Sequence, residues 1–227
     1  MQQAAGGALP GPVIAHPAMP WVALDGGIGV GKTTTLGRLR EAGVAVLEEP
    51  VGDPATNKRG PWDDLLDDMY KQLPGAAFAF QKRVVADRAL SKLATQLGQS
   101  KTSWACMERS PDMQRRTFLR MQGFGAEQLR ELEALYDEAA ALWRPAAIIY
   151  LRVPPEVSFA RMQRRARASE AGVTLEYHTR LHEAHEAAVV ELREEGVVPV
   201  TCIDAAGMSD EEVATAVLKA YKSSFVR

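Results

Sequence analysis

The stretch WVALDGGIGVGKTT, residues 21–34, joins a short apolar run to a glycine-rich turn. From Gly26 to Thr33 it matches the pattern G-x-x-x-x-G-K-[ST], which here follows a predicted strand and precedes a predicted helix. Glycines let successive backbone N–H groups face phosphate oxygens, and the positive end of the helix dipole attracts the same anions. The stretch therefore predicts an α/β fold of the P-loop NTPase type, with a nucleoside triphosphate bound at this turn.

The nucleotide at this loop is expected to be ATP, bound with Mg²⁺. The lysine of this motif, here Lys32, reaches the β- and γ-phosphates, and the hydroxyl of Thr33 ligates the magnesium ion. The alternative is an ordinary glycine-rich turn with a solvated lysine, which the strand and the helix on either side disfavour. The expected donor-binding residues form one run: Gly26, Gly27, Ile28, Gly29, Val30, Gly31, Lys32, Thr33 and Thr34.

Short apolar runs alternate along the chain with longer stretches of helical periodicity. Such alternation is typical of a parallel sheet flanked by helices, and we predict five strands in one parallel sheet. The expected strands are Trp21–Asp25, Val44–Glu48, Ser103–Glu108, Ala146–Val153 and Val197–Ile203. The expected helices are Lys32–Ala42, Phe78–Leu97, Glu127–Trp143, Pro155–Arg167, Leu175–Glu195 and a last one that Ser209 caps and that runs to Tyr221, while Val51–Pro61 has the composition of a loop.

Composition and charge narrow the class of protein. The chain has 227 residues, 46% hydrophobic and 25% charged, as expected for one globular domain. Lys and Arg total 27 against 29 Asp and Glu, so no global positive field attracts nucleic acid or an anionic membrane. No apolar run approaches the ~18 residues of a membrane span. We therefore expect a soluble protein that binds neither nucleic acid nor membranes.

The cysteines and the N-terminal segment bear on location and domain limits. Cys106 and Cys202 show no metal-binding spacing, which argues for a reducing compartment, and we expect both in buried strands of a cytoplasmic protein. Residues 1–20 are rich in Ala, Gly and Pro, contain no Lys or Arg and lack the charge of a targeting signal. We expect this segment to be disordered and residues 21–227 to form a single domain.

Acidic residues stand where two of the predicted strands end. Glu48 and Glu49 close the second strand, and Glu108 with Arg109 closes the third. Open α/β sheets bind ligands at this carboxyl edge, where a carboxylate can take the proton from a hydroxyl that accepts phosphate. Glu49, which Pro50 follows, is the better candidate base. The alternative is an ordinary charged strand end. It is disfavoured because two such strand ends occur together with the phosphate loop.

The order and spacing of several motifs resemble the deoxynucleoside kinases, from Trp21 to Asp204. This family includes the insect multisubstrate enzyme and the vertebrate deoxycytidine, deoxyguanosine and mitochondrial thymidine kinases. The resemblance implies ATP-dependent phosphorylation of a deoxynucleoside 5′-hydroxyl for nucleotide salvage, by a homodimer. It is carried by the phosphate loop, Glu49-Pro50-Val51, Met69-Tyr70, Phe80-Gln81, Glu108-Arg109-Ser110, Ile149-Tyr150-Leu151-Arg152 and the block Arg161 to Glu186.

The resemblance also implies catalytic roles. Glu49 would be the general base, with Arg109 beside it, and Glu108 would join Thr33 around Mg²⁺. Residues 161–172 would form a helical, arginine-rich lid over ATP. The guanidinium groups of Arg165 and Arg167 would bind the donor and offset the charge that develops during phosphoryl transfer.

For the substrate, a small-molecule deoxynucleoside, the resemblance implies a second set of residues. Tyr70 and Glu170 would bind the sugar 3′-hydroxyl, and Gln81 would recognise the edge of the base. Arg88 stands where some relatives pair an arginine with an aspartate, and the partner position here is Gln114. We expect Arg88 to disfavour thymidine by collision with its methyl group. Apolar contacts to the base are expected from Val84 and Phe118, together with Ile28 and Phe80.

Two other functions remain open at this point. A thymidylate-type nucleotide kinase shares the loop and the arginines, but its acceptor phosphate would be repelled by Glu49. A catalytically silent structural subunit would not need Lys32, Glu49 and Arg109 together. Trp62 follows the Glu49-Pro50-Val51 triplet later than the tryptophan usual in the family, so its role is left open. His178, His182 and His185 share one predicted helix, where we expect structural roles and no metal.

Overall fold

A computed structural model describes residues 20–52, 58–89 and 104–225 of the chain. The segment expected to be disordered, residues 1–20, lies outside this range except for its last residue. No helix in the described part of the chain is both long and apolar enough to span a membrane.

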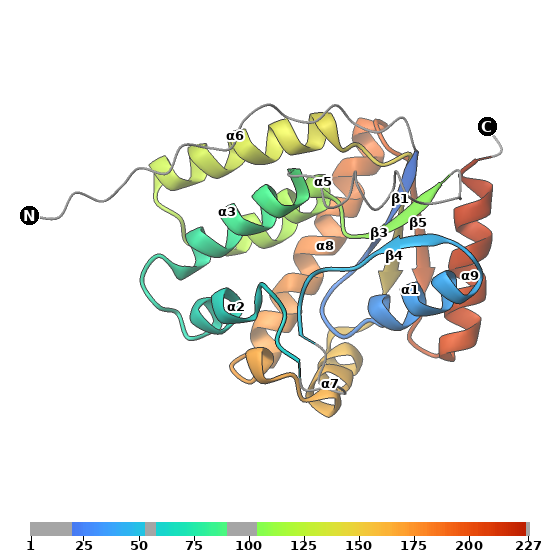
Figure 1. Ribbon diagram of the computed structural model, residues 1–227, viewed down its shortest axis with the longest axis horizontal. Helices are drawn as coiled ribbons and strands as arrows, with labels where there is room; N and C mark the ends of the chain where they lie inside the picture. Colours follow the sequence, from blue (N-terminus) through green and yellow to red (C-terminus); the bar gives the residue numbers. More distant parts are fainter. Residues whose placement is uncertain (1–19, 53–57, 90–103, 226–227) are drawn as a thin grey trace, which may run out of the picture.

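Five parallel strands form one sheet (Figure 1). They are β1 (Trp21–Asp25), β2 (Ala45–Leu47), β3 (Ala105–Glu108), β4 (Ala147–Arg152) and β5 (Val200–Asp204), in the order β2-β3-β1-β4-β5. After β1 the chain forms β2 and β3 on one side of β1 and later β4 and β5 on the other. The connections therefore diverge beside β1. A crevice opens at such a point at the carboxyl ends of the strands, and the predicted catalytic residues lie there.

Helices cover both faces of the sheet (Figure 1). The bounds are α1 (Lys32–Glu41), α2 (Asp63–Tyr70), α3 (Ala76–Ala89), α5 (Pro111–Gln114), a π-helix (Arg115–Leu119), α6 (Ala126–Leu142), α7 (Pro155–Arg165), a 3₁₀ turn (Ala168–Glu170), α8 (Leu175–Glu195) and α9 (Asp210–Ser223). They agree with the predicted α/β class.

The alternation of side chains in β1 assigns the helices to the two faces. Val22 and Leu24 belong to the core cluster that includes Leu36 of α1 and Val217 of α9. Trp21 and Ala23 belong to the cluster on the opposite face, with Met113 of α5 and Ala188 and Leu192 of α8. Because β1 is buried on both faces, its first four residues are all apolar, as is usual for a central parallel strand.

Several element ends differ from the predicted ones. Helix α7 ends at Arg165 instead of Arg167, because Ala166 adopts a left-handed conformation with φ 53°. Strand β5 begins at Val200 instead of Val197, after Pro199, which has no N–H to donate to a neighbouring strand. The described part of the helix expected over Phe78–Leu97 is α3, and its remainder lies outside the described residues.

Other local predictions are confirmed. Ser209 caps α9, since its hydroxyl accepts a hydrogen bond from the N–H of Glu212. Cys106 is buried in β3, as expected, whereas Cys202 is only half-buried in β5.

Candidate active site

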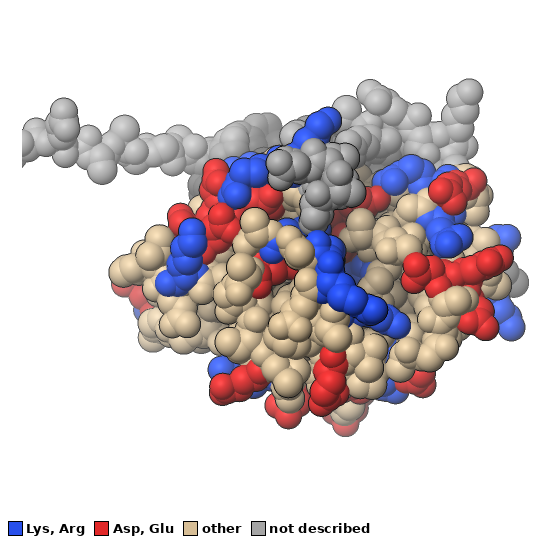
Figure 2. Space-filling view, turned by 90° about the horizontal axis from the view of Figure 1, so that it is seen from below, with Lys and Arg blue, Asp and Glu red and all other residues tan. Residues whose placement is uncertain are grey.

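One cavity of about 870 Å³ opens at the carboxyl edge of the sheet. Segments that lie far apart in the sequence line it: the phosphate loop, the residues after β2, helices α2 and α3, the segment from Glu108 to Phe118, the turn after α7 and the first residue of α9. Helix α7 contributes Arg161 and Arg165 to the rim. Figure 2, seen from below, shows basic side chains gathered near the middle of this side of the molecule, with acidic ones toward its edges.

The phosphate loop contributes most of its residues to the cavity wall. Thr33 and Thr34 are exposed there. Val30 is instead packed in the core, and Gly26 and Gly27 lie behind the wall. The loop residues that line the cavity are Ile28, Gly29, Gly31, Lys32, Thr33 and Thr34.

Glycine is required at position 29 of the loop. Gly29 has φ +74°, and a Cβ added there would lie 2.3 Å from the carbonyl oxygen of Ser158 in α7. The loop is therefore packed directly on the helix that ends at Arg165.

Lys32 folds back onto its own loop. Its ammonium donates hydrogen bonds to the carbonyl oxygens of Gly26, at 2.9 Å, and Gly27, at 2.6 Å, and lies 3.8 Å from a carboxylate oxygen of Glu108. Burial, followed by the charge of Arg109, lowers the pKa of Lys32 to about 8, although Glu108 opposes this shift. The ammonium of Lys32 is thus held where the negative charge of a bound phosphate would balance its positive charge.

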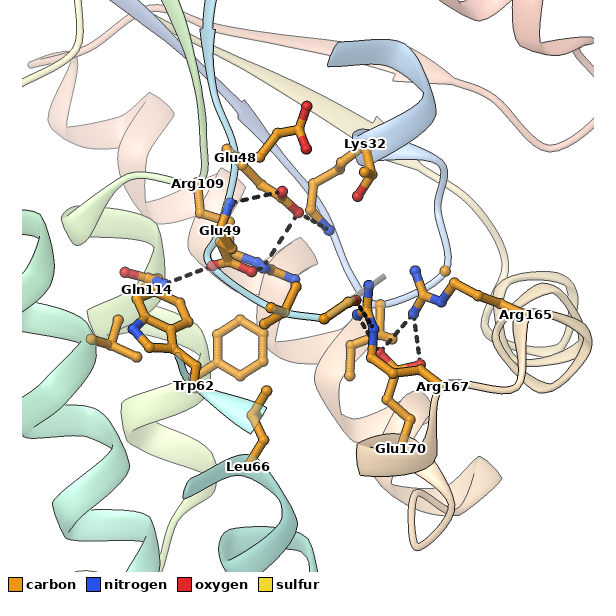
Figure 3. Close-up of a pocket in the computed structure, with 18 of the residues that line it drawn as sticks. Lys32, Glu48, Glu49, Trp62, Leu66, Arg109, Gln114, Arg165, Arg167 and Glu170 are labelled. Atoms are coloured by element: carbon orange, nitrogen blue, oxygen red, sulfur yellow. Dashed lines mark hydrogen bonds and ion pairs between the residues drawn. The ribbon is translucent and has the colours of Figure 1, made fainter. Parts of the chain in front are cut away.

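Glu49 lies between two donors on the opposite side of the cavity (Figure 3). Arg109 donates a hydrogen bond to one carboxylate oxygen of Glu49 and forms an ion pair with it. The side-chain amide of Gln114 donates to the other oxygen at 3.3 Å. The backbone N–H of Glu49 in turn donates to Glu108 at 3.3 Å. The two predicted strand-end acids therefore meet, and Glu49 is fixed in orientation.

Arg109 is held in an unusual backbone conformation. Its φ of +59° lies in the left-handed region, which a long side chain rarely adopts and which is found mostly at functional sites. Its guanidinium carbon lies 5.0 Å from the centre of the Phe118 ring. Burial alone would lower the pKa of Arg109, but Glu49, Glu108 and Asp25 together raise it. Arg109 consequently stays charged.

Asp25 connects the two sides of the cavity, a role that its sequence position at a strand end did not reveal. One carboxylate oxygen accepts from the N–H of Gly26 at 2.8 Å and the other from the N–H of Ser110 at 3.1 Å. Asp25 is fully buried, which raises its pKa although Arg109 opposes this. It joins the start of the phosphate loop to the turn that presents Arg109.

The remaining wall is apolar and aromatic. Tyr70, Phe80, Val84 and Phe118 line the cavity, as the resemblance implied. Trp62, whose role was left open, also lines it and packs edge-on against Phe80 with ring centres 5.9 Å apart. Apolar and aromatic side chains of this kind are suited to contact a nucleobase.

Hydrogen bonds hold the polar side chains near this wall in fixed orientations. The Gln81 side-chain oxygen accepts from the Tyr136 hydroxyl at 2.7 Å. The Trp62 indole N–H donates to Asp87 at 2.7 Å. Gln114 lines the cavity with its amide nitrogen directed at Glu49, a contact that the sequence did not suggest. The side chain of Arg88 lies outside the described residues.

Glu170 holds both lid arginines (Figure 3). Arg165 donates to its two carboxylate oxygens at 2.7 Å, and Arg167 donates to one of them at 3.0 Å. Arg167 also reaches the carbonyl oxygen of Gly52 at 3.1 Å, which joins the lid to the residues after β2. Burial, followed by the charges of Tyr177 and Glu170, raises the pKa of Tyr70. Glu170 and Tyr70 both line the cavity.

The residues predicted to hold magnesium are compatible with it. Thr33 and Glu108 both line the cavity beside Lys32. Mg²⁺ bound together with phosphate groups keeps several waters and needs only one or two protein oxygens. Among the described residues, no group of three or more His, Cys, Asp or Glu is arranged to hold a metal without such help. Of the helix histidines, His178 bonds a backbone carbonyl and His185 the carbonyl of Leu181.

Comparisons with known proteins agree with this geometry. The family model described as deoxynucleoside kinase matches residues 22–227. The thymidine kinase of Ictalurid herpesvirus 1 is 35% identical over 173 residues, which are 72% of this chain and 72% of the viral one. The probable deoxycytidine kinase of fowlpox virus is 29% identical over 200 residues, 82% of this chain and 79% of the relative.

A solved structure supports the fold independently. The deoxyadenosine kinase of M. mycoides, solved with bound products, superposes with a TM-score of 0.66 over 89% of this chain and 98% of the other, at 20% sequence identity. With the P-loop sheet, the strand-end acids and a family match over almost the entire described chain, this protein belongs to the deoxynucleoside kinase family.

Proposed function

We propose that the chain transfers the γ-phosphate of ATP to the 5′-hydroxyl of a deoxynucleoside, with Glu49 as the general base. Membership of the family makes it a kinase that phosphorylates deoxynucleosides. The observation that carries the detailed proposal is that Lys32 and Glu49 line the same cavity. A donor phosphate at the loop and a hydroxyl beside Glu49 would then lie within reach of each other.

The acceptor side supplies the base. The Glu49 carboxylate takes the proton of the 5′-hydroxyl as the oxygen attacks phosphorus. The hydrogen bonds from Arg109 and Gln114 fix the carboxylate while it does so. The positive charge of Arg109 also reduces the repulsion between Glu49 and the incoming phosphate.

The donor side supplies cations. Lys32 exchanges its loop carbonyls for phosphate oxygens, and Arg165 and Arg167 leave Glu170 to contact the phosphates as the lid closes. Thr33 and Glu108 would hold Mg²⁺, which supplies charge neutralisation on the phosphates when bound.

The nucleoside would lie against the aromatic wall. Its base would contact Val84, Phe118 and the Gln81 amide, and Tyr70 with Glu170 would bind the sugar 3′-hydroxyl. Since Glu170 also holds the lid arginines, its release from them would accompany substrate binding. Arg88 remains the proposed determinant against thymidine.

The decisive experiment is a substrate panel. Purified protein with ATP and Mg²⁺ is assayed on deoxycytidine, deoxyadenosine, deoxyguanosine and thymidine, with cytidine and dTMP as controls. We expect turnover of at least one deoxynucleoside, with little of cytidine and none of dTMP. Turnover of dTMP alone would establish a nucleotide kinase, and inactivity on all six despite ATP binding would establish a structural subunit. Thymidine as the best substrate by kcat/KM would overturn the role of Arg88.

We also propose a cytoplasmic homodimer. The support is the family resemblance and the lack of metal-binding spacing around the two cysteines, one buried and one half-buried. Light scattering after size-exclusion chromatography tests the dimer, since a mass near the monomer value of 24.7 kDa would exclude it.

A further inference from the structure

His178 lies in α8 and has no part in the mechanism above, yet it contacts the phosphate loop. Its side chain is buried, with 2% of its surface exposed. The Nε2 atom lies 2.9 Å from the carbonyl oxygen of Ile28 and 3.0 Å from the hydroxyl oxygen of Ser158. The Nε2 atom of His178 in α8 thus contacts both the phosphate loop and helix α7.

These partners fix the position of the imidazole proton. A carbonyl oxygen only accepts hydrogen bonds, so Nε2 must carry the hydrogen that it donates to Ile28. The same hydrogen is shared with the Ser158 oxygen, while the Ser158 hydroxyl donates to the carbonyl oxygen of Pro154 or Pro155, each 3.2 Å away. The other ring nitrogen, Nδ1, is buried and has no hydrogen-bond partner among the described residues.

The contact lies where three elements meet. Helices α7 and α8 pack against each other (Figure 1), and the ring of Phe159 meets His178 edge-on at 5.6 Å between centres. Gly29, next to Ile28 in the loop, leaves no room for a Cβ against Ser158. A displacement of the His178 ring would therefore move the loop relative to the helix that ends in Arg165.

The electrostatic surroundings keep this donor neutral. Burial lowers the pKa of His178 below its ordinary value, and Lys32 and Arg165 lower it further, whereas the Ile28 bond and Glu170 act in the opposite direction. A neutral imidazole donates one hydrogen bond without adding charge beside the loop. It can therefore fix the backbone of Ile28 in the free enzyme and in the complex alike.

We propose that His178 is a positioning residue that ties the phosphate loop at Ile28 to the lid helix at Ser158 and so prepares the loop for the donor nucleotide. The inference rests on the proposed role of residues 26–34 in binding donor phosphates. It places a determinant of donor affinity in α8, outside the loop motif and the lid.

The test replaces His178 with two amide side chains of different length. In His178→Gln, the amide nitrogen occupies the place of Nε2 and keeps the bond to Ile28. In His178→Asn, the shorter side chain cannot span that distance, although its polarity is the same. His182→Asn, on the half-buried histidine one turn further along α8, is the matched control. Dissociation constants for ATP and for the best deoxynucleoside of the panel, kcat, both KM values and Tm are measured for all four proteins.

We expect His178→Asn to weaken ATP binding roughly tenfold and to raise the KM for ATP by a similar factor, with deoxynucleoside affinity unchanged. His178→Gln should restore most of the loss, and His182→Asn should resemble wild type. Equal loss of both ligands, or equal ATP affinity in the Asn and Gln variants, would overturn the proposal. If His178→Asn does not fold, Ser158→Ala replaces it, with a loss confined to ATP expected and no loss overturning the inference.

The two levels of proposal can be told apart. If wild-type protein binds no nucleoside triphosphate, the proposed role of the phosphate loop itself is wrong. If wild type binds ATP and the Asn variant binds it equally well, only the role of His178 is wrong.

Discussion

The donor and acceptor sides of the cavity are built in opposite ways. On the donor side, Lys32 bonds the carbonyls of Gly26 and Gly27, six and five residues away in the sequence. On the acceptor side, Glu49 is held by Arg109 and Gln114, which lie 60 and 65 residues further along the chain. The first is a local motif, and the second exists only after the sheet has formed.

This difference has a physical consequence. Local contacts cost little chain entropy, so the loop conformation follows from its glycines and the strand and helix beside it. The acceptor site needs the ends of β2 and β3 to be adjacent, and Asp25 joins that pair of strands to the loop. Changes on the acceptor side should therefore affect chemistry, whereas changes in the loop should affect backbone conformation and donor affinity together.

The largest expected effect comes from Glu49→Gln. The amide keeps the shape of the side chain but cannot accept the hydroxyl proton, so kcat should fall roughly 10²–10⁴-fold. ATP affinity, measured by titration calorimetry, should stay within about threefold, because the donor side is untouched. Glu48→Gln is the neighbouring control, since that exposed carboxylate pairs with Arg40. Turnover within tenfold of wild type would exclude Glu49 as the base.

Gly29→Ala should disturb the donor side in both stability and affinity. The methyl group would meet Ser158 at 2.3 Å and force a non-glycine residue to φ +74°. We expect a loss of about 2 kcal/mol or more in the free energy of unfolding, with weaker ATP binding. Gly37→Ala in α1 is the control, because no atom lies within 4 Å of its added Cβ, and it should stabilise by about 0.5–1 kcal/mol. Equal stability of the two variants would contradict the close packing at Gly29.

Asp63→Ala probes the long-range organisation of the acceptor side. The buried Asp63 carboxylate accepts from the N–H groups of Gly52, at 2.9 and 3.1 Å, and Gly60, at 2.9 Å. Without it, two N–H groups lose their partner, and we expect urea unfolding to report a loss of about 1–3 kcal/mol. Since Gly52 lines the cavity three residues after Glu49, the KM for the deoxynucleoside should rise too. An unchanged KM would show that this loop does not shape the acceptor side.

The smallest effect concerns His185, which lies between the two sides. It is fully buried, 3.7 Å from Asp25 and edge-on to Phe118. Burial lowers the pKa of His185 to about 3, below the ordinary 6.5 of the unfolded chain. Between these two pH values the unfolded chain carries a proton on His185 that the folded chain does not. The contribution of His185 to stability is therefore complete above about pH 6.5 and is lost as the pH falls toward 3.

His185→Phe should therefore flatten the dependence of stability on pH. Urea unfolding at pH 6 and pH 5 should show a slope lower than that of wild type by up to about 1.4 kcal/mol per pH unit. Other titrating groups are present in both proteins and cancel in the comparison. Identical slopes would mean that His185 is charged in the folded state and paired with Asp25.

The parts of the molecule that the sequence predicted are the local ones. The phosphate loop and the sheet follow from patterns within a few residues, and all five strands were expected near their observed places. Helix α2 was not predicted, because its eight residues, Asp63–Tyr70, are too short for a clear helical period. The roles of Glu49 and Arg109 were expected from the family resemblance, and the structure brings their side chains together.

What the sequence could not predict depends on three-dimensional proximity. Asp25 looked like a strand end, yet it bonds the backbone at the start of the phosphate loop and at the turn after β3. Gln114 donates to Glu49, a contact that its expected place opposite Arg88 did not suggest. His178 was expected to be structural, and only the fold brings it to Ile28, 150 residues away. Such contacts have no local pattern, since the intervening elements decide which side chains meet.

Because of the π-helix Arg115–Leu119, the shape of the acceptor side depends on the number of residues in this turn. A π-helical turn is rare and is frequently found at functional sites. Here that wider turn holds Phe118, whose ring lies over the guanidinium of Arg109. Deletion of one residue from this turn would restore an ordinary helix and rotate Phe118 by roughly 100° relative to Arg109. The spacing between Arg109 and α6 is thus a determinant of the cavity that tolerates substitution better than deletion.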